Sequence, residues 1–469
     1  MIPYFPKQIA YRAIVTYLIS LTVISIFYSS HAMKFGYMAL GFAFVAGFFS
    51  LTCYWSKEGM RTSEKEFIKE LFIVAVILRL VWVVASYFYY IKFTGIPFEF
   101  DTADALGYHD EAIWMNQEGW NTVWERYFGP HSIGISDVGY PLYLTLIYSI
   151  FGPVVIIPRI IKAFIGAYTC VLIYKLSSRT FGNDTGRMAA IMAAFMPNLI
   201  IYCGYHLKEV EMLFLEVAFM ERMDYLIRNR KITIGNVILV SLLALSLFFF
   251  RTVLGAAAVF SFASIVVFSN APTMKKGWKR TALIAYGVLG LAVAGGGTIM
   301  TEVEGLWEER EDNATSKRYE QTVRGNQWAK YATGTVMAPM VFVLPFSTMV
   351  DVDQQYAQQT KHGGNFIRNF MGFFALIAIY EAVRRKKWRD FVLIGSFVLA
   401  YLGVVSLSGF SNSERFLLPG LPCLIMMWAY GISALREKTY RLLTPWCFLV
   451  FAMEFGWAFF KLGSRGLLS

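Results

Sequence analysis

The stretch from Phe98 to Asn121 is the first long polar segment in a very apolar sequence. It holds Asp101, Asp104, His109, Asp110 and Glu111 within a few turns of chain. A carboxylate within hydrogen-bond reach of a hydroxyl can take its proton, and such assistance typically accelerates a reaction by about 10²–10⁴-fold. Apolar segments end just before this stretch and resume soon after it. The pattern indicates a reaction site where a membrane-embedded bundle meets water.

Three residues of this stretch share a helical spacing. Asp104, Tyr108 and Ala112 follow the pattern DxxxYxxxA, which places them on one stripe of a helix. Asp110 and Glu111 fall off that stripe. Acidic residues in a polar loop are usually just solvated, so the spacing alone assigns no chemistry. One histidine, His109, among scattered carboxylates does not make a convincing metal site, and it is more simply interpreted as a hydrogen-bonding loop residue.

The composition is that of a protein with many membrane-spanning segments. Of 469 residues, 57% are hydrophobic and only 16% are charged, which argues against a soluble enzyme. The formal charge of +11 could suggest a nucleic-acid partner, but basic loops beside membrane spans explain much of it more simply. The five cysteines show no CxxC spacing and predict neither disulfides nor a metal site.

A helix needs roughly 20 apolar residues to cross the hydrocarbon core. The predicted spans are 9–29, 36–55, 70–92, 153–174, 186–205, 209–227, 232–250, 252–269, 281–300, 366–383, 390–408, 416–435 and 442–460. The shorter apolar pieces 139–151 and 335–349 predict helices that lie in the interface or re-enter it. The first span lacks a clear cleavage site and is expected to be retained. The fold is therefore predicted to be an all-α polytopic bundle of about 12–13 transmembrane helices.

Basic residues predict the orientation. With a cytoplasmic N-terminus, six short inside loops hold 22 of the 43 Lys and Arg residues. Both long loops, 93–152 and 301–365, then lie outside. Three regions follow: an N-terminal module (1–300) with the catalytic loop 93–152, an outer loop 301–365 whose charged part (301–334) forms a small cap, and C-terminal helices (366–469).

Further motifs follow in a fixed order. They are GYPLYL from Gly139, PRIIKAFIGAYTCVLIYKLSSRTFG from Pro158, MAAIMAAFMPNLIIYCGYHLKEVEMLF from Met188, and ERFLLPGLP from Glu414. With DxxxYxxxA, this ordered set resembles the GT-C glycosyltransferases. The likeness is strongest to bacterial relatives of dolichyl-phosphate-mannose protein mannosyltransferases and of the aminoarabinose transferase acting on lipid A. It covers about residues 70–225, and 410–435 by one motif.

The resemblance implies an enzyme that takes a sugar from a polyprenyl-phosphate carrier and passes it to an acceptor on the outer face of the membrane. Asp104 occupies the position of the family's essential Asp, and a single inverting displacement needs only one base. Family members often have Asp-Glu there, whereas this chain has Ala105, so Asp101 is the candidate to stand in for the missing acid. A divalent metal is left open as a cofactor. The expected location is the bacterial inner membrane.

A lipid-phosphate leaving group requires cations. The resemblance places Arg415, at the start of RFLLPGLP, near the lipid phosphate, although a snorkelling arginine would look the same. Arg251 and Lys208 are further candidates for substrate binding, together with Tyr108 and His109. Two of these residues have another interpretation: Arg251 as a turn-forming charge, and Lys208 as the partner of nearby acids. Arg79 lies mid-span, where a structural ion pair and a role in transfer are equally expected.

The acceptor is left open among a protein hydroxyl, a lipid A-like glycolipid and a surface polysaccharide. A polysaccharide polymerase or ligase of the same fold, with a lipid-pyrophosphate donor, is the main alternative. A basic outer loop would favour it, whereas loop 301–334 contains many acids. A lipid or solute transporter predicts inverted repeats, and the sequence contains no evident repeat. A structural scaffold would leave DxxxYxxxA and RFLLPGLP unexplained.

Overall fold

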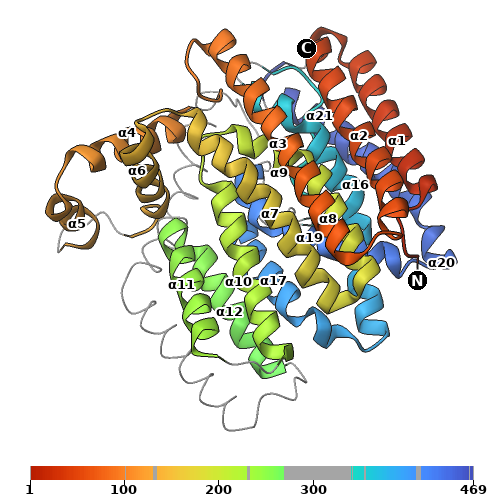
Figure 1. Ribbon diagram of the computed structural model, residues 1–469. Helices are drawn as coiled ribbons and strands as arrows, with labels where there is room; N and C mark the ends of the chain where they lie inside the picture. Colours follow the sequence, from red (N-terminus) through yellow and green to blue (C-terminus); the bar gives the residue numbers. More distant parts are fainter. Residues whose placement is uncertain are drawn as a thin grey trace.

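The computed structural model is an all-α helical bundle, as the sequence predicts (Figure 1). It describes residues 2–100, 102–129, 135–229, 233–268, 340, 342–352, 355–407, 413–463 and 465–467. Within those ranges the only β pairing is a single antiparallel bridge between Ala32 and Val350. Asp101, the predicted span 281–300 and the predicted cap 301–334 lie outside the described residues.

The first three helices are long and antiparallel. They are α1 (Lys7–Phe27), α2 (Phe35–Gly59) and α3 (Glu64–Thr94). A capping box begins α3, because Ser63 and Glu66 satisfy each other's backbone N–H groups. Gly95 ends the helix in the left-handed region, with φ 78°. At 1.5 Å per residue, α3 is about 46 Å long, enough to cross a bilayer and carry the chain to its surface.

The centre of the bundle is α7 (Ile156–Phe181), which packs against α3, α8 and α10. Next along the chain come α8 (Asn183–Phe195), α9 (Pro197–Ile201), the 3₁₀ turn η2 (Tyr202–Gly204) and α10 (Glu209–Asn229). The chain bends by 54° between α8 and the α9–η2 segment. Pro197 lies at that bend, where its missing N–H and its ring interrupt the helix.

The remaining helices complete the bundle around this centre. They are α11 (Ile234–Phe250), α12 (Thr252–Phe268), α16 (Tyr356–Arg384), η4 (Trp388–Phe391), α17 (Val392–Leu407), α18 (Glu414–Leu417), η5 (Leu418–Gly420), α19 (Leu421–Ser433), α20 (Glu437–Tyr440) and α21 (Leu443–Gly463). Helix α16 packs against α2 and α19, and α12 packs against α17.

Eight helices in the described part of the chain are long and apolar enough to cross a membrane, or nine if the bent α8–α9 pair is one span. Every predicted span within the described ranges is helical, with breaks at Pro197 and Pro419 in two of them. Besides the bent α8–α9 pair, three of these helices are not among the eight. Helices α11 and α12 have 17 residues each, and α10 carries several acidic side chains along its length.

The predicted outer loop 93–152 folds into three helices: α4 (Ala103–Gln117), α5 (Trp120–Phe128) and α6 (Gly139–Phe151). Helix α5 exposes Trp120 and Trp124, a residue type enriched at membrane interfaces. The predicted helix at 335–349 is wrong for the described residues, because 342–349 form a turn followed by chain without regular secondary structure. Pro345 lies within this piece and cannot donate a helical hydrogen bond.

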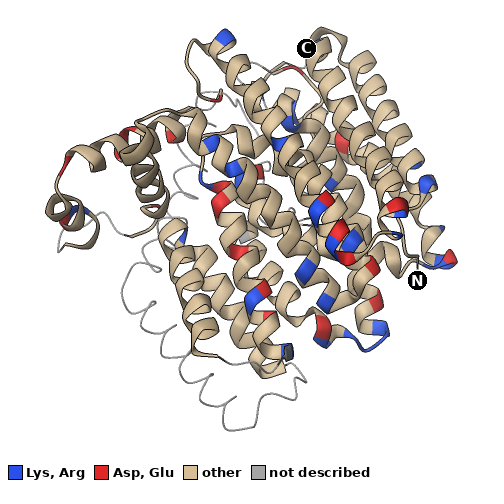
Figure 2. Ribbon diagram, in the orientation of Figure 1, with Lys and Arg blue, Asp and Glu red and all other residues tan. Residues whose placement is uncertain are grey.

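Different segments of the chain lie at the two ends of the bundle. At one end, Ile2 N–H donates to the Ser433 carbonyl at 2.9 Å, and Arg187 donates to the Thr62 carbonyl at 2.9 Å. Basic loops gather at this end, whereas α4 lies at the other (Figure 2). This arrangement agrees with the orientation expected from the basic residues, which stays a prediction.

Arg79 is fully buried, and among the described residues it hydrogen-bonds to the end of α8 rather than forming an ion pair. Its guanidinium donates to the carbonyls of Ala193 at 3.3 Å and Ala194 at 3.4 Å. In a regular helix the Ala193 carbonyl would accept a hydrogen bond from the N–H of residue 197, but Pro197 has no N–H to donate. A Cβ on Gly166 would lie 3.0 Å from Arg79 Nε, so glycine leaves room for the guanidinium. Arg79 therefore caps the broken helix, a role that neither sequence interpretation included.

We expect Arg79→Met to lower the thermal midpoint of the purified protein, because each hydrogen bond to a charged group contributes about 1.5–3 kcal/mol. The matched control is Arg61→Met, which removes only an exposed pair with Glu58. Thermal unfolding in detergent, followed by intrinsic fluorescence, measures both variants. Equal midpoints for the two variants would contradict the capping role of Arg79.

Candidate functional site

The guanidinium of Arg415 lies at the centre of a cluster of polar side chains at the mouth of the bundle. Its Nε donates to Glu209, its Nη1 donates to Asp104, and its Nη2 donates to the Tyr108 hydroxyl at 3.4 Å. The side chain of Glu209 is 1% exposed and that of Asp104 is 55% exposed. One arginine thus joins a buried carboxylate to a carboxylate that faces water.

Three elements that are distant in the sequence supply this cluster. Asp104 lies in the first turn of α4, where the helix dipole favours a negative charge. Glu209 is the first residue of α10. Arg415 belongs to the short helix α18, which gives way to a 3₁₀ turn containing Pro419. The breaks in the helices bring charged side chains to the mouth of the bundle.

The residue before Arg415 is anchored from the other side. Glu414 pairs with Lys361 of α16 at 2.9 Å and accepts a hydrogen bond from Asn198 of α9. Asn198 also donates to Asn365 at 3.1 Å. Residues 414 and 415 are therefore fixed to α9, α10 and α16 through buried polar contacts.

Two further cations border the cluster. Lys208 pairs with Asp137, donates to the Phe250 carbonyl at 3.0 Å, and lies 5.8 Å from the centre of the Tyr108 ring. Arg251 donates to the Tyr401 hydroxyl at 3.3 Å. Burial, reinforced by the positive charge of Arg251, holds the pKa of Lys208 well below its ordinary value.

Tyr108 stands between the charges of this cluster. Burial is the main reason that its pKa rises to about 12, so it remains a neutral hydroxyl at physiological pH. Its ring packs edge-on against Tyr140 of α6, with ring centres 5.1 Å apart. Tyr108 can therefore donate a hydrogen bond to an anion beside Arg415.

The structure brings together most of the residues singled out from the sequence. Asp104, Tyr108 and Arg415 are in contact, and Lys208 and Arg251 border them. Lys208 pairs with Asp137 rather than with the acids expected from the sequence, Glu209 and Glu211. Sequence reasoning missed Glu209 as a partner of Arg415, although an acid at the predicted outer end of a span was a usable signal.

His109 points away from this cluster into a separate buried network. Its Nδ1 lies 2.7 Å from the Tyr148 hydroxyl, which lies 3.2 Å from Nε2 of His206. The His206 backbone N–H donates to Glu99, and Glu99 pairs with Arg159 of α7 at 3.3 Å. The network attaches α4 and the segment before it to α6 and α7, so His109 is placed to dock α4.

The described residues contain no group of three or more His, Cys, Asp or Glu side chains arranged to hold a metal ion. The carboxylates of the cluster have cationic partners instead: Arg415 for Asp104 and Glu209, and Lys208 for Asp137. Within the described residues, acids that are already paired in this way do not fit a divalent metal.

No family model matches the chain, and no curated protein sequence matches it. A similar solved structure is the oligosaccharyltransferase AglB from Archaeoglobus fulgidus in complex with an inhibitory peptide and a dolichol-phosphate. It has a TM-score of 0.48 and 13% identity, over 86% of this chain and 56% of that one. An Archaeoglobus fulgidus oligosaccharyltransferase in complex with Zn and sulfate has a TM-score of 0.43 and 11% identity, over 83% and 53%. This chain spans little more than half the length of either protein, and a likeness this distant places it in no family.

Burial lowers the pKa of His109 from its ordinary value, so the folded protein binds a proton there less readily than the unfolded chain does. Stability should therefore fall as pH drops through about 6.5, the ordinary pKa of histidine. We expect His109→Gln to reduce the loss of thermal midpoint between pH 7.5 and pH 5.5. His31→Gln, outside this network, is the control. A pH dependence that both variants leave unchanged would contradict the role of His109.

Proposed function

We propose that this chain is an integral membrane glycosyltransferase of the GT-C type that uses a polyprenyl-phosphate-linked sugar. The observation that supports the proposal is the meeting of Asp104, Arg415 and Tyr108 at the mouth of the bundle, the first two being 311 positions apart in the sequence. A base and a phosphate-binding cation side by side are what transfer from a lipid phosphate requires.

Asp104 is the proposed general base. Its side chain is 55% exposed, so an acceptor hydroxyl arriving from the water side can reach it. The acceptor oxygen attacks the anomeric carbon from the face opposite the phosphate, and its proton passes to Asp104. One displacement inverts the anomeric centre and needs no covalent sugar–enzyme intermediate. Asp101 stays a candidate for a second acid near this position.

Arg415 is the proposed phosphate ligand. As the bond between sugar and phosphate breaks, negative charge develops on the departing oxygen, and a fixed guanidinium stabilises that charge without reorganising. Glu209 orients the guanidinium through Nε, and Tyr108 supplies a neutral donor beside it. Lys208 and Arg251 add positive potential from the neighbouring elements.

The acceptor is proposed to be a glycan, a glycolipid or a protein hydroxyl on the outer face of a bacterial inner membrane. We further propose that 1–300 form the catalytic module, 301–365 an outer region, and 366–469 a C-terminal helical unit that supplies Arg415. The surface of α4, α5 and α6 would then meet donor and acceptor where lipid and water adjoin.

We expect Asp104→Asn to lose transfer by about 10²–10⁴-fold while inserting and purifying normally, because asparagine keeps the shape but cannot accept the proton. Release of polyprenyl phosphate from a panel of synthetic polyprenyl-phosphate sugars, with membranes of the source cell as acceptor, measures the rate. Asp110→Asn, off the Asp104 stripe, is the matched control and should keep most of the activity. Near-normal turnover by Asp104→Asn would refute the assignment of the base.

A further inference from the structure

If the proposed function is right, the contact between Asp104 and Arg415 determines whether the donor or the acceptor reacts with the site first. The Nη1 group of Arg415 donates to Asp104, and the neighbouring Nη2 donates to Tyr108. A phosphate bound by this arginine needs the same outward-facing donors. The guanidinium cannot present them fully to a carboxylate and to a phosphate at the same time.

We propose that Asp104 and the donor phosphate compete for Arg415, so that phosphate binding releases the catalytic carboxylate toward the acceptor. Before the donor binds, the Asp104 carboxylate occupies the place of the phosphate on Arg415. In that state its oxygen is bound to the guanidinium and cannot accept the acceptor proton. The donor binds first, and the acceptor hydroxyl loses its proton only after the exchange. The role of Asp104 thus extends beyond proton transfer to control of donor binding.

The burial of Glu209 and Asp104 determines which of their contacts with Arg415 breaks when phosphate binds. Glu209 is almost fully buried and holds Nε, so removing its partner would leave a charge inside the bundle. Asp104 is more than half exposed, and its carboxylate can return to water with little loss. The arginine therefore stays attached to α10 and exchanges only its outer contacts.

The exchange leaves the covalent step balanced. The acceptor oxygen forms its bond to the anomeric carbon, and the bond from that carbon to the phosphate oxygen breaks. The phosphate leaves with the electron pair and remains opposite Arg415. The acceptor proton moves to the Asp104 oxygen that the guanidinium has given up, and no further reactant is needed.

The test is equilibrium binding of undecaprenyl phosphate to the full chain in lipid nanodiscs. We expect Asp104→Asn to bind this probe roughly twofold to fivefold more tightly, the equivalent of losing one exposed competing ion pair. Glu209→Gln should weaken binding, because the guanidinium loses its anchor. Asp110→Asn should bind like the parent protein, and undecaprenol, which lacks the phosphate, should show no gain with any variant.

A double-mutant cycle separates competition from a general change of charge. In an Arg415→Ala background, adding Asp104→Asn should give no tightening, since the shared partner is gone. Unchanged or weaker binding by Asp104→Asn overturns the exchange, even if that variant is inactive in transfer. An active Asp104→Asn variant refutes the proposed base instead, so the two failures are distinguishable.

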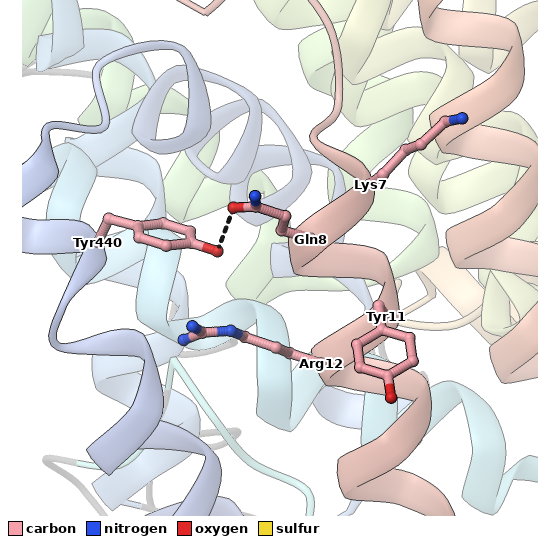
Figure 3. A pocket seen from close by; sticks show the side chains of 5 residues that line it. All are labelled: Lys7, Gln8, Tyr11, Arg12 and Tyr440. Atoms are coloured by element: carbon pink, nitrogen blue, oxygen red, sulfur yellow. Dashed lines mark hydrogen bonds between the residues drawn. The ribbon is translucent and has the colours of Figure 1, made fainter.

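A second inference is independent of that function and concerns the opposite end of the bundle. A cavity of about 410 Å³ is lined there by Lys7, Gln8, Tyr11, Arg12 and Tyr440 (Figure 3). Arg12 donates to Thr444 at 2.8 Å, and the Tyr440 hydroxyl donates to Gln8 at 2.8 Å. Two cations and no carboxylate line the cavity, and the contact with Thr444 holds the Arg12 side chain in place.

The helices on either side of the cavity expose apolar side chains along their length. Leu18 and Ile19 of α1 are 40% and 50% exposed, and Phe448 of α21 is 71% exposed. We infer that the cavity binds the headgroup phosphate of an anionic phospholipid whose acyl chains lie along α1 and α21. Basic pockets beside transmembrane helices attract such headgroups through charge, while the helices provide the apolar contact.

Native mass spectrometry of the full chain with phosphatidylglycerol or phosphatidylcholine tests this site. We expect the double variant Lys7→Gln/Arg12→Gln to lose one retained phosphatidylglycerol, while Lys57→Gln/Arg61→Gln, at the same end of the bundle, retains it. Phosphatidylcholine should not occupy the site, and inorganic phosphate should not displace the lipid. Unchanged retention by the first variant, or displacement by inorganic phosphate, overturns the lipid site.

Discussion

A charged side chain inside a membrane bundle requires a partner, and the coupling of Arg415 to Glu209 is the contact on which the candidate site depends. Glu209 begins α10 and is fully buried, so its charge is tolerated only because the guanidinium lies against it. The same guanidinium reaches outward to Asp104. One arginine thus links α18 to α10 through a buried ion pair and to α4 through an exposed one.

Breaks in the helices make this coupling geometrically available. A continuous helix satisfies its own backbone and presents side chains only around its axis, whereas a broken one can direct its ends and its polar residues at one point. Pro197 and Pro419 lie at such breaks. Beside them, Asn198 and Lys361 hold Glu414, and Arg79 satisfies the carbonyls left by the first break. Helices that bend toward the mouth of the bundle therefore require polar side chains in its interior.

Hydropathy predicted most helices because each span must satisfy its backbone hydrogen bonds within itself. The stripe of Asp104 and Tyr108 could also be predicted, since helical spacing is a local property. Contacts between distant residues could not: the pairing of Arg415 with Glu209 joins positions 206 residues apart and arises from packing. The prediction over 335–349 fails at the described residues 342–349 for a related reason, because an apolar run containing Pro345 satisfies hydropathy without forming a helix there.

An arginine that faces two carboxylates is well oriented, and its positive charge is more than balanced by theirs, which suits a site that must release a phosphate as well as bind it. A free guanidinium in a dry pocket would hold the lipid phosphate product tightly and slow each turnover. Glu209 keeps the planar donor group in one orientation, while Asp104 passes the acceptor proton to water and returns to the guanidinium as phosphate departs. Catalysis benefits from charge stabilisation that is strongest in the transition state, not from tight binding of the product. The two acids around Arg415 provide that difference through one buried contact that stays and one exposed contact that can exchange.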